Sequence, residues 1–377
     1  MLGLKEKKQL MRFSIKREEI VRHLVTVCGV VERRHTLPIL SNVLLSVKDS
    51  QLSLMATDLE IEIRTALKVL SSEEGKVTVS ARKFLEICRA LPSGSALEAQ
   101  YKEGQFYIHS GRSRFTLSTL PAEDFPSIDS IDAVAELELT QAELKQLLHR
   151  TVFCMAHQDV RYYLNGLLLE LTEESIHAVA TDGHRLALAS LAKGADQEGT
   201  EIQSIIPRKA ILELVRLLEE SQEPVRLKFG TNQMRAEFQG LSFSTKLIDG
   251  QFPDYKRVIP VGCEKQFVAD RERFKQALVR VNILTNDKYR GVHLHLSDLK
   301  LQAIVTNLEQ GSAEEELDIK YQGENLEIVF NNFYLIDVLN IIDTKEVRLT
   351  FTNASSSCLI TPIDASDSKY VVMPMRL

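Results

Sequence analysis

The chain has 377 residues, of which 44% are hydrophobic and 26% charged, and its formal net charge is −6. This length exceeds what one ordinary hydrophobic core organises and predicts two or three domains. The chain contains no run of about 18 apolar residues, which argues against a transmembrane helix, and the first ten residues lack the apolar centre of a secretory signal. The negative net charge argues against a surface that is basic all over, but not against basic residues gathered on one inner face.

The five cysteines, Cys28, Cys88, Cys154, Cys263 and Cys358, are far apart in the sequence. Their odd number and the absence of a CxxC spacing argue against a disulfide framework or a zinc site. We therefore expect free thiols in a reducing cytoplasm and no metal or cofactor.

The predicted elements follow one order. A helix at 16–27 has Ile20, Leu24 and Val27 at helical spacing, and alternating strands follow at 43–47, 51–56 and 60–64. A second helix is predicted at 83–91, followed by strands at 105–110 and 114–119.

The same order then repeats twice. Thr57, Thr181 and Thr306 lie in similar segments that are 124 and 125 positions apart. Ala81, Pro207 and Asn331 align in a second set, and the openings KREEIVRHLVTV, TQAELKQLLHRTV and DRERFKQALVRV form a third. A fourth set closes the units at Phe125-Pro126, Phe252-Pro253 and Met373-Pro374. A shared period of this kind indicates a repeat architecture.

Three domains of about 125 residues follow from this period, close to the usual domain size. We expect an extension at 1–10 and domains at 11–134, 135–263 and 264–377. Each domain should be α+β, with two helices packed on antiparallel sheet. Three such domains in one chain would form an arc with two exposed sheet edges, and a head-to-tail contact with a second copy could close a ring.

The predicted helices carry the basic residues that the inside of such a ring would need. They are Arg17, Arg22, Lys83, Arg89, Lys145, Arg150, Arg208, Lys209, Arg216, Arg271, Arg273, Lys275 and Arg280. The last helix, NNFYLIDVLNII, has none, and ordinary solvated helix faces of mixed charge remain an alternative.

Two other functions are open at this point. Asp182-Gly183-His184-Arg185, with His157 and Asp159, could suggest a catalytic site, but the sequence has no GxSxG, HExxH, P-loop or dinucleotide-binding motif. A repeat-built scaffold that never meets DNA is the second alternative.

Seven segments resemble the beta subunit of bacterial DNA polymerase III, the sliding clamp, and the resemblance covers residues 11–377. They are HTLPILSN (35–42), ATDLEIEI (56–63), SGRSRFTLSTLPAEDFP (110–126), AHQDVRYYLNG (156–166), ATDGHRLA (180–187), DGQFPDYKRVIP (249–260) and YVVMPMRL (370–377). The resemblance implies a non-enzymatic, cytoplasmic homodimer that forms a six-domain ring around double-stranded DNA. It also implies an ATP-driven clamp loader, and docking of the DNA polymerase III core, other polymerases and repair proteins through a short peptide.

The resemblance assigns residues to three surfaces. DNA contacts are expected from Arg34, Arg82, His157, Gln158, Tyr162 and Tyr163, although the two tyrosines could instead pack at a domain junction. The peptide groove is expected to use Leu164, Thr181, Gly183, His184, Arg185, Leu186, Pro253, Arg257, Val258, Ser357, Val371, Met373, Pro374, Met375, Arg376 and Leu377. The dimer interface is expected to use Lys83, Arg112, Arg114, Phe115, Leu117, Ile283, Leu284, Glu309, Glu314 and Glu315.

The sequence departs from the family at Gly311 and Ser312, where acidic residues are common among its members. Fewer charge pairs at this point would weaken the dimer interface without removing it.

Overall fold

The structure is a computed structural model. It describes residues 10–32, 37–128, 130–193, 201–285, 290–307, 309–321, 323–363 and 367–375. The chain divides into two compact units, one of Met1–Gln141 with Ser221–Leu247 and the other of Ala142–Glu220 with Ile248–Leu377. In the described ranges, no helix is long and apolar enough to cross a membrane.

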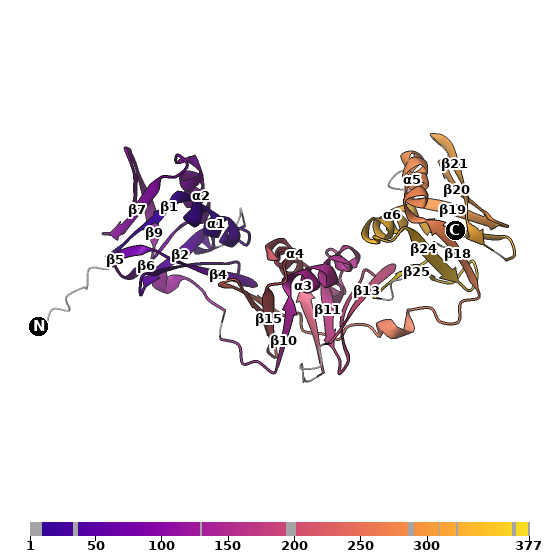
Figure 1. Cartoon of the computed structure of the whole chain (residues 1–377), viewed down its shortest axis with the longest axis horizontal. Helices are drawn as coiled ribbons and strands as arrows, with labels where there is room; N and C mark the ends of the chain where they lie inside the picture. Colours follow the sequence, from indigo (N-terminus) through magenta and orange to yellow (C-terminus); the bar gives the residue numbers. More distant parts are fainter. Residues whose placement is uncertain are drawn as a thin grey trace, which may run out of the picture. The chain divides into compact units, whose positions relative to one another are not determined.

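The first unit contains one antiparallel sheet of 13 strands, in the order β10-β15-β16-β17-β4-β3-β2-β6-β9-β8-β7-β1-β5 (Figure 1). Its strands are β1 (Met11–Lys16), β2 (Asn42–Lys48), β3 (Gln51–Thr57), β4 (Ile61–Lys68), β5 (Leu70–Glu73), β6 (Gly75–Ser80), β7 (Ala96–Lys102), β8 (Gln105–Ser110), β9 (Ser113–Leu120), β10 (Ala135–Thr140), β15 (Pro224–Phe229), β16 (Gln233–Phe238) and β17 (Leu241–Lys246). A short 3₁₀ turn, η1 (Pro38–Ser41), precedes β2, and another, η2 (Ala122–Asp124), follows β9.

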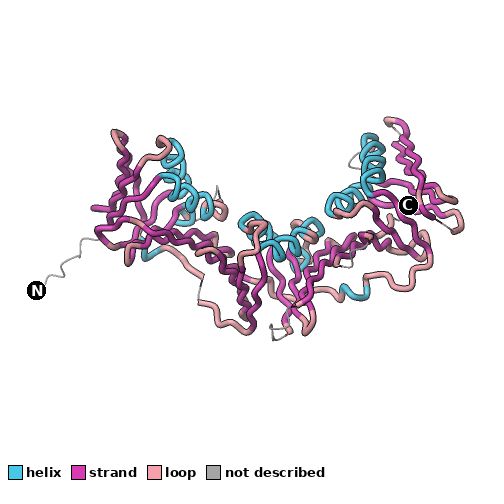
Figure 2. Tube along the Cα trace, in the orientation of Figure 1, coloured by secondary structure: helices cyan, strands magenta, loops and turns pink. Residues whose placement is uncertain are grey.

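Two helices of this unit, α1 (Arg17–Val27) and α2 (Ala81–Ala90), pack against each other and lie side by side in Figure 2. The spacing of Ile20, Leu24 and Val27 puts all three side chains on the buried face of α1. Full burial of side chains of this size contributes about 1.5–3 kcal/mol each. The helix α2 ends at Ala90, one residue before Leu91, which is buried as its C-cap.

The second unit contains two antiparallel sheets, one of nine strands and one of four. The order of the first is β14-β11-β12-β13-β26-β25-β24-β18-β22, and that of the second is β21-β20-β19-β23. The strands are β11 (Gly166–Leu171), β12 (Ser175–Thr181), β13 (Arg185–Ala192), β14 (Ile202–Pro207), β18 (Lys265–Asp270), β19 (Gly291–Ser297), β20 (Lys300–Asn307), β21 (Gly311–Asp318), β22 (Lys320–Tyr321), β23 (Leu326–Asn331), β24 (Glu346–Phe351), β25 (Cys358–Pro362) and β26 (Ser368–Val372).

The remaining helices are α3 (Gln141–His149), α4 (Arg208–Leu217), α5 (Arg271–Val281) and α6 (Asn332–Ile341). Four 3₁₀ turns complete the set: η3 (Val152–Cys154), η4 (Tyr162–Asn165), η5 (Tyr255–Arg257) and η6 (Asn282–Leu284). Side chains cap the starts of α5 and α6. Asp270 accepts from the Arg273 N–H at the start of α5, and Asn331 accepts from the Phe333 N–H at the start of α6. Arg150, expected within α3, lies just after its end.

The same strand pairing occurs at both places where one repeat meets the next. Strand β17 of the second repeat pairs with β4 of the first, and β26 of the third repeat pairs with β13 of the second. Phe243 lies opposite Ile63 in the first junction, and Tyr370 lies opposite Ala187 in the second. The repeat therefore extends to the way the domains are joined.

The alignment of Met373-Pro374 with Phe252-Pro253 was wrong. The Met375 N–H bonds to a carbonyl of β23 just as the Ile248 N–H bonds to a carbonyl of the equivalent strand β14. Met375 therefore corresponds to Ile248, and Met373-Pro374 corresponds to a position several residues before Phe252-Pro253. Two matching residues are too few to fix an alignment, whereas equivalent backbone hydrogen bonds identify equivalent positions.

Candidate functional site

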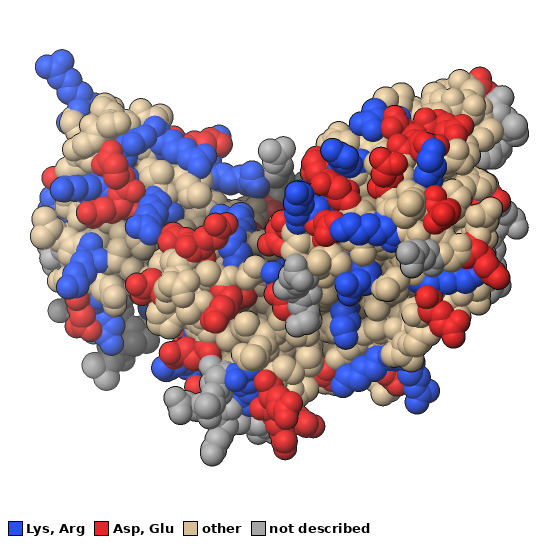
Figure 3. Space-filling view, turned by 45° about the vertical axis from the view of Figure 1, so that its right-hand side comes forward, with Lys and Arg blue, Asp and Glu red and all other residues tan. Residues whose placement is uncertain are grey.

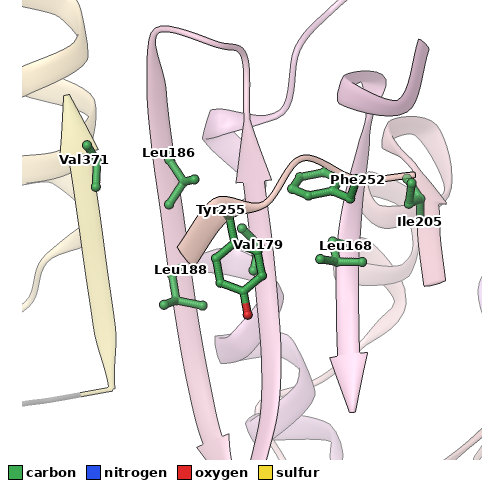
Figure 4. Close-up of a cluster of buried hydrophobic side chains, with 8 residues drawn as sticks. All are labelled: Leu168, Val179, Leu186, Leu188, Ile205, Phe252, Tyr255 and Val371. Atoms are coloured by element: carbon green, nitrogen blue, oxygen red, sulfur yellow. The ribbon is translucent and has the colours of Figure 1, made fainter. Parts of the chain in front are cut away.

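A buried apolar cluster lies on the sheet formed by β14, β11, β12, β13 and β26 (Figure 4). Strand β13 contributes Leu186 and Leu188, and the connecting segment after β17 lays Phe252 and Tyr255 across the strands. The other members are Leu168, Val179, Ile205 and Val371. Because the members come from two sequence repeats, this cluster joins the second domain to the third.

Five partly buried hydrophobic side chains surround this cluster: Tyr163, Ile248, Val258, Ile259 and Leu359. We call them the rim. Only Tyr163 and Val258 were among the residues singled out from the sequence, and Tyr163 was assigned to DNA. Apolar atoms that are half exposed beside a buried cluster are suited to receiving an apolar partner.

The predicted groove residues divide by exposure. Leu164, Leu186 and Val371 are buried, with 1–2% of their surface exposed, so they can only support the surface from below. Met373 and Met375 are exposed by 37% and 40%, as expected from the sequence. Pro253, His184 and Arg257 are also exposed, and Ser357, Pro374 and Val258 are half-buried. Arg376 and Leu377 lie outside the described residues.

The repeated Ala-Thr-Asp motif forms a hairpin turn. The Thr181 hydroxyl donates to the Arg185 carbonyl and accepts from the Gly183 N–H, and the Asp182 carboxylate accepts from the N–H groups of His184 and Arg185. Gly183 has φ +87, which favours glycine. The first repeat forms the same turn from Thr57 and Asp58. Thr181 and Asp182 thus shape the loop.

Arg185 is anchored inside the second unit. Its guanidinium donates to the Asp182 carboxylate at 3.0 Å, the Asp337 carboxylate at 2.6 Å and the Phe153 carbonyl at 3.0 Å, and it lies 4.4 Å from the centre of the Tyr334 ring. Only 12% of its side chain is exposed. Arg185 therefore holds β13 to α6, a role that sequence reasoning missed because Tyr334 and Asp337 lie far along the chain.

A buried carboxylate holds the turn η5 in place. The Tyr255 hydroxyl and the Gln203 amide donate to Glu170, and Lys256 lies 3.6 Å from it. Burial raises the pKa of Glu170, but the hydrogen bonds from Tyr255 and Gln203 outweigh it, so the pKa lies below its usual value. Burial and the Glu170 carboxylate raise the pKa of Tyr255, which keeps its hydroxyl protonated as a donor.

The loop before β11 presents three of the residues predicted to contact DNA. Asp159 accepts from the Arg161 side chain at 2.9 Å. The Asp159 N–H donates to the Asn165 side-chain oxygen, and the Asn165 amide donates to the Asp159 carbonyl. The Arg161 hydrogen bonds lower the pKa of Asp159 to about 2, so this carboxylate stays ionised. The bracing leaves His157, Gln158 and Tyr162 exposed, with Tyr162 at 58%.

The remaining predicted DNA residues differ from these three. Tyr163 is partly buried and packs against the apolar cluster. Arg82 is exposed on α2 in the other unit and donates to the Val31 carbonyl at 2.8 Å. Arg34 lies outside the described residues.

The strands β21 and β9 are among those that have an open edge in the described ranges. Strand β21 ends its sheet, and β9 pairs with β8 along its length but with β6 only at Thr119 and Leu120. Arg112 and Arg114 are exposed on or next to β9, while Phe115 and Leu117 are half-buried there. Ile283, in the turn after α5, is exposed by 76%. Open edges of this kind can accept a strand from another chain.

Several of the predicted interface charges already have partners in their own chain. Glu315 pairs with Arg280 at 2.7 Å, and Lys83 pairs with Glu86 at 2.8 Å. Glu314 accepts from the Gln302 amide at 3.1 Å, and Glu309 is exposed. Positive and negative side chains are also interspersed over the face shown in Figure 3.

Comparison with known proteins accounts for this arrangement. The sequence matches the three domains of the DNA polymerase III beta subunit: the N-terminal domain over residues 11–129, the central domain over 138–254 and the C-terminal domain over 256–376. The chain belongs to the family of the DNA polymerase III beta subunit. It is 47% identical to the beta sliding clamp of Pseudomonas putida over 368 residues, which cover 97% of this chain and all of that one.

Other sliding clamps give the same result. The beta sliding clamp of Escherichia coli K12 is 46% identical over 369 residues, 97% of this chain and all of the relative. The solved structure of the Pseudomonas aeruginosa sliding clamp bound to griselimycin has a TM-score of 0.94 and 48% identity, covering 97% of this chain and all of that one. The C. crescentus beta sliding clamp has a TM-score of 0.94 and 38% identity, covering 98% and 100%.

In this sliding-clamp family member, the family and the α+β fold of three repeated domains expected from the sequence are confirmed. Sequence reasoning missed Glu170, Tyr334 and Asp337, and the rim residues Ile248, Ile259 and Leu359. The DGQFPDYKRVIP segment indicated that something functional lay near residues 249–260, but no local pattern indicated the side chains on other strands that hold it.

Proposed function

We propose that this chain works as a DNA sliding clamp, a ring that encircles duplex DNA and tethers the replicative polymerase and other replication and repair proteins to it. The observation that carries the proposal is the match to sliding clamps over 97% of the chain at 46–48% identity. A clamp raises processivity because its attachment is topological, so its contacts with DNA can be weak and independent of sequence. We propose that it acts without catalysis and in the cytoplasm, where bacterial DNA is replicated.

The repeated strand pairing supports a head-to-tail dimer. Within the chain, β4 and β13 each receive a strand from the following repeat, β17 and β26. In the third repeat the equivalent of β4 and β13 is β21, which ends its sheet, and in the first repeat the equivalent of β17 and β26 is β9. Pairing β21 of one copy with β9 of a second copy would form the same kind of junction between chains. A dimer would contain two such junctions, and together they would close a ring.

The register of this contact follows from the two junctions inside the chain. Phe243 lies opposite Ile63 and Tyr370 opposite Ala187. By repeat equivalence, Phe115 takes the place of Phe243. Ala313 takes the place of Ile63, because Ala313 faces Val305 in its own hairpin as Ile63 faces Ala56. Phe115 of one copy would then lie opposite Ala313 of the other.

This register puts Arg114, next to Phe115, opposite Glu314, next to Ala313. Cross-strand pairs of opposite charge contribute roughly 0.2–1 kcal/mol each, and the ring would contain two of them. Ile283 and Leu284 would add apolar contact, and Arg112, Leu117, Lys83 and Glu309 would lie around it. Glu315, already paired with Arg280, would contribute little new attraction.

We propose that Arg34, Arg82, His157, Gln158 and Tyr162 face the DNA. Arginine and amide side chains can bond to phosphate oxygens, which carry no base information. The braced loop at 156–165 holds an aromatic ring and two polar side chains outward, which suits contact with sugar or with an exposed base. Tyr163 would support this loop from below.

We propose that partner peptides bind over the apolar cluster, between the rim residues and the tail residues 373–377. Methionine side chains adapt to different partners, so Met373 and Met375 suit a surface that accepts several peptides. Pro253, Arg257, Val258 and His184 would border the bound peptide.

Griselimycin, which binds the P. aeruginosa sliding clamp, can probe this surface. Val258→Arg puts a charge into the rim and should lower griselimycin affinity at least tenfold, as measured by surface plasmon resonance. Val261→Arg changes a valine of the same segment that is 88% exposed, and should bind normally. Equal loss in both variants, or in neither, would mean that the groove has been placed wrongly.

The domain boundaries at 134/135 and 263/264, and an extension at 1–10, are part of the proposal. The first boundary lies between the family matches that end at 129 and begin at 138, and the second lies within the match that begins at 256.

Retention on DNA tests the proposed function. The chain is loaded onto nicked circular DNA with the clamp loader of the same organism and ATP, and the circle is then cut. Release on cutting would establish topological attachment. Retention after cutting would indicate adhesive binding, and no retention with an active loader would favour the scaffold alternative.

A further inference from the structure

The four-stranded sheet of the third domain brings two histidines and a glutamate together on one face. Strand β19 lies between β20 and β23, and the alternation of its side chains puts His293 and His295 on the same side. Glu327 of β23 lies directly opposite His295 in the antiparallel ladder. The cluster therefore stands on two hydrogen-bonded strands, not on a loop.

The donor atoms of the three side chains converge. His293 Nδ1 lies 2.9 Å from Glu327 Oε1, and His295 Nε2 lies 3.7 Å from the same oxygen. The imidazole rings are stacked, with 6.3 Å between centroids and 14° between planes. One ligand atom from each residue lies within 4.8 Å of the other two.

We propose that His293, His295 and Glu327 form a binding site for a divalent transition-metal ion of the zinc class. Imidazole nitrogen and carboxylate oxygen are ligands that zinc accepts, at about 2.0–2.2 Å, and three protein ligands leave one position of a tetrahedron for water. Donors around such an ion lie roughly 3.4 Å apart, so small side-chain rotations would complete the geometry. Mg²⁺ and Ca²⁺ prefer oxygen ligands and would bind poorly.

The surroundings leave a path for the ion. The side chains of His293, His295 and Glu327 are 29%, 37% and 52% exposed, so the cluster is open to solvent on one side. One histidine would be enough to form a cross-strand hydrogen bond with Glu327. Here nitrogens of two histidines approach the same Glu327 oxygen, which is an arrangement suited to a shared ion. These residues form no local metal motif in the sequence, because Glu327 lies 32 positions after His295, on another strand.

The site lies close to the proposed peptide surface. Val329, opposite His293, accepts a backbone hydrogen bond from Met375, and a side chain at Gly291 would meet the Met375 sulfur at 3.6 Å. A bound ion would tie β19 to β23, the strand whose Val329 carbonyl accepts the hydrogen bond from Met375 of the tail. Because of this placement, griselimycin affinity can also be measured with and without the metal. The metal site itself does not depend on whether the chain is a sliding clamp.

The test uses the untagged full chain and Zn²⁺ alone, by isothermal titration calorimetry. We expect one ion per chain, with at least a tenfold loss of affinity in His293→Asn, His295→Asn and Glu327→Gln. His149→Asn, at the exposed end of α3, is the matched control and should bind normally. Co²⁺ should give the visible absorption of four- or five-coordinate cobalt in the wild type, and lose it in His293→Asn.

Two results would overturn the proposal. Unchanged stoichiometry and affinity in the double variant His293→Asn/His295→Asn would assign the zinc to other groups, such as the cysteines. No heat and no cobalt spectrum in the wild type would leave the cluster as a cross-strand ion pair. Circular dichroism of the metal-free variants shows whether each is folded. If a histidine variant is unfolded, Glu327→Gln replaces it in the titration.

Discussion

Arg185 of β13 donates a hydrogen bond to Asp337 of α6 across 2.6 Å, and thereby joins the second domain to the third. The guanidinium is held in place by Asp182 and by the Tyr334 ring at the same time. Asp337→Asn should lower the free energy of unfolding by about 1 kcal/mol, because one charge-assisted hydrogen bond at a partly exposed carboxylate is weakened. Urea unfolding measures it, with exposed Asp343→Asn as the control. An equal effect of both substitutions would mean that the contact adds no stability.

Substitutions of the adjacent residues Tyr162 and Tyr163 should have different effects on stability and on DNA synthesis. Tyr163 packs on the apolar cluster, so Tyr163→Ala should lower the free energy of unfolding by about 1–3 kcal/mol. Tyr162 is exposed by 58%, so Tyr162→Ala should change it by less than about 0.5 kcal/mol. Only Tyr162→Ala should reduce clamp-dependent DNA synthesis under conditions in which both variants are folded. The reverse pattern would contradict the two assignments.

A charge exchange tests the derived register of the dimer contact. Arg114→Glu places two acidic residues opposite each other and should shift sedimentation from twice 42.6 kDa towards 42.6 kDa at low concentration. The double variant Arg114→Glu/Glu314→Arg restores opposite charges and should recover the dimer. Lys102→Glu, on an exposed position of β7, which β8 separates from β9, should leave the mass unchanged. Failure of the double variant to recover would show that Arg114 and Glu314 are not opposite each other.

The buried Glu170 should make stability depend on pH. Its pKa in the folded chain lies below the ordinary value of 4.5 because Tyr255 and Gln203 donate to the ionised form. A lowered folded-state pKa contributes stability that is present above the unfolded pKa and is lost as the pH falls through the folded pKa. Between pH 7 and about pH 4.5 this contribution should be constant, and it should decline below that. The difference in unfolding free energy between wild type and Glu170→Gln should therefore shrink in acid, and a difference that stays constant down to pH 3 would contradict this role.

Much of the fold follows from the sequence because helices and strands are encoded by local spacing. The positions of Ile20, Leu24 and Val27 predicted α1, and the strand at 105–110 has the bounds of β8. The period of 124–125 positions predicted three equivalent domains, since equivalent cores need equivalent apolar patterns. The motif at 180–187 was singled out from the sequence, and in the structure Thr181 and Asp182 form a turn.

The sequence by itself determined the repeat, the α+β class and the family. Only the tertiary structure decided that Tyr163 packs inward while Tyr162 does not, that Glu315 is already paired, and that Glu327 meets two histidines. These facts depend on which strands are neighbours and in what register, and a shift of one residue would reverse every side chain of a strand. Register is set by packing between segments far apart in the chain, so no local pattern could have shown it.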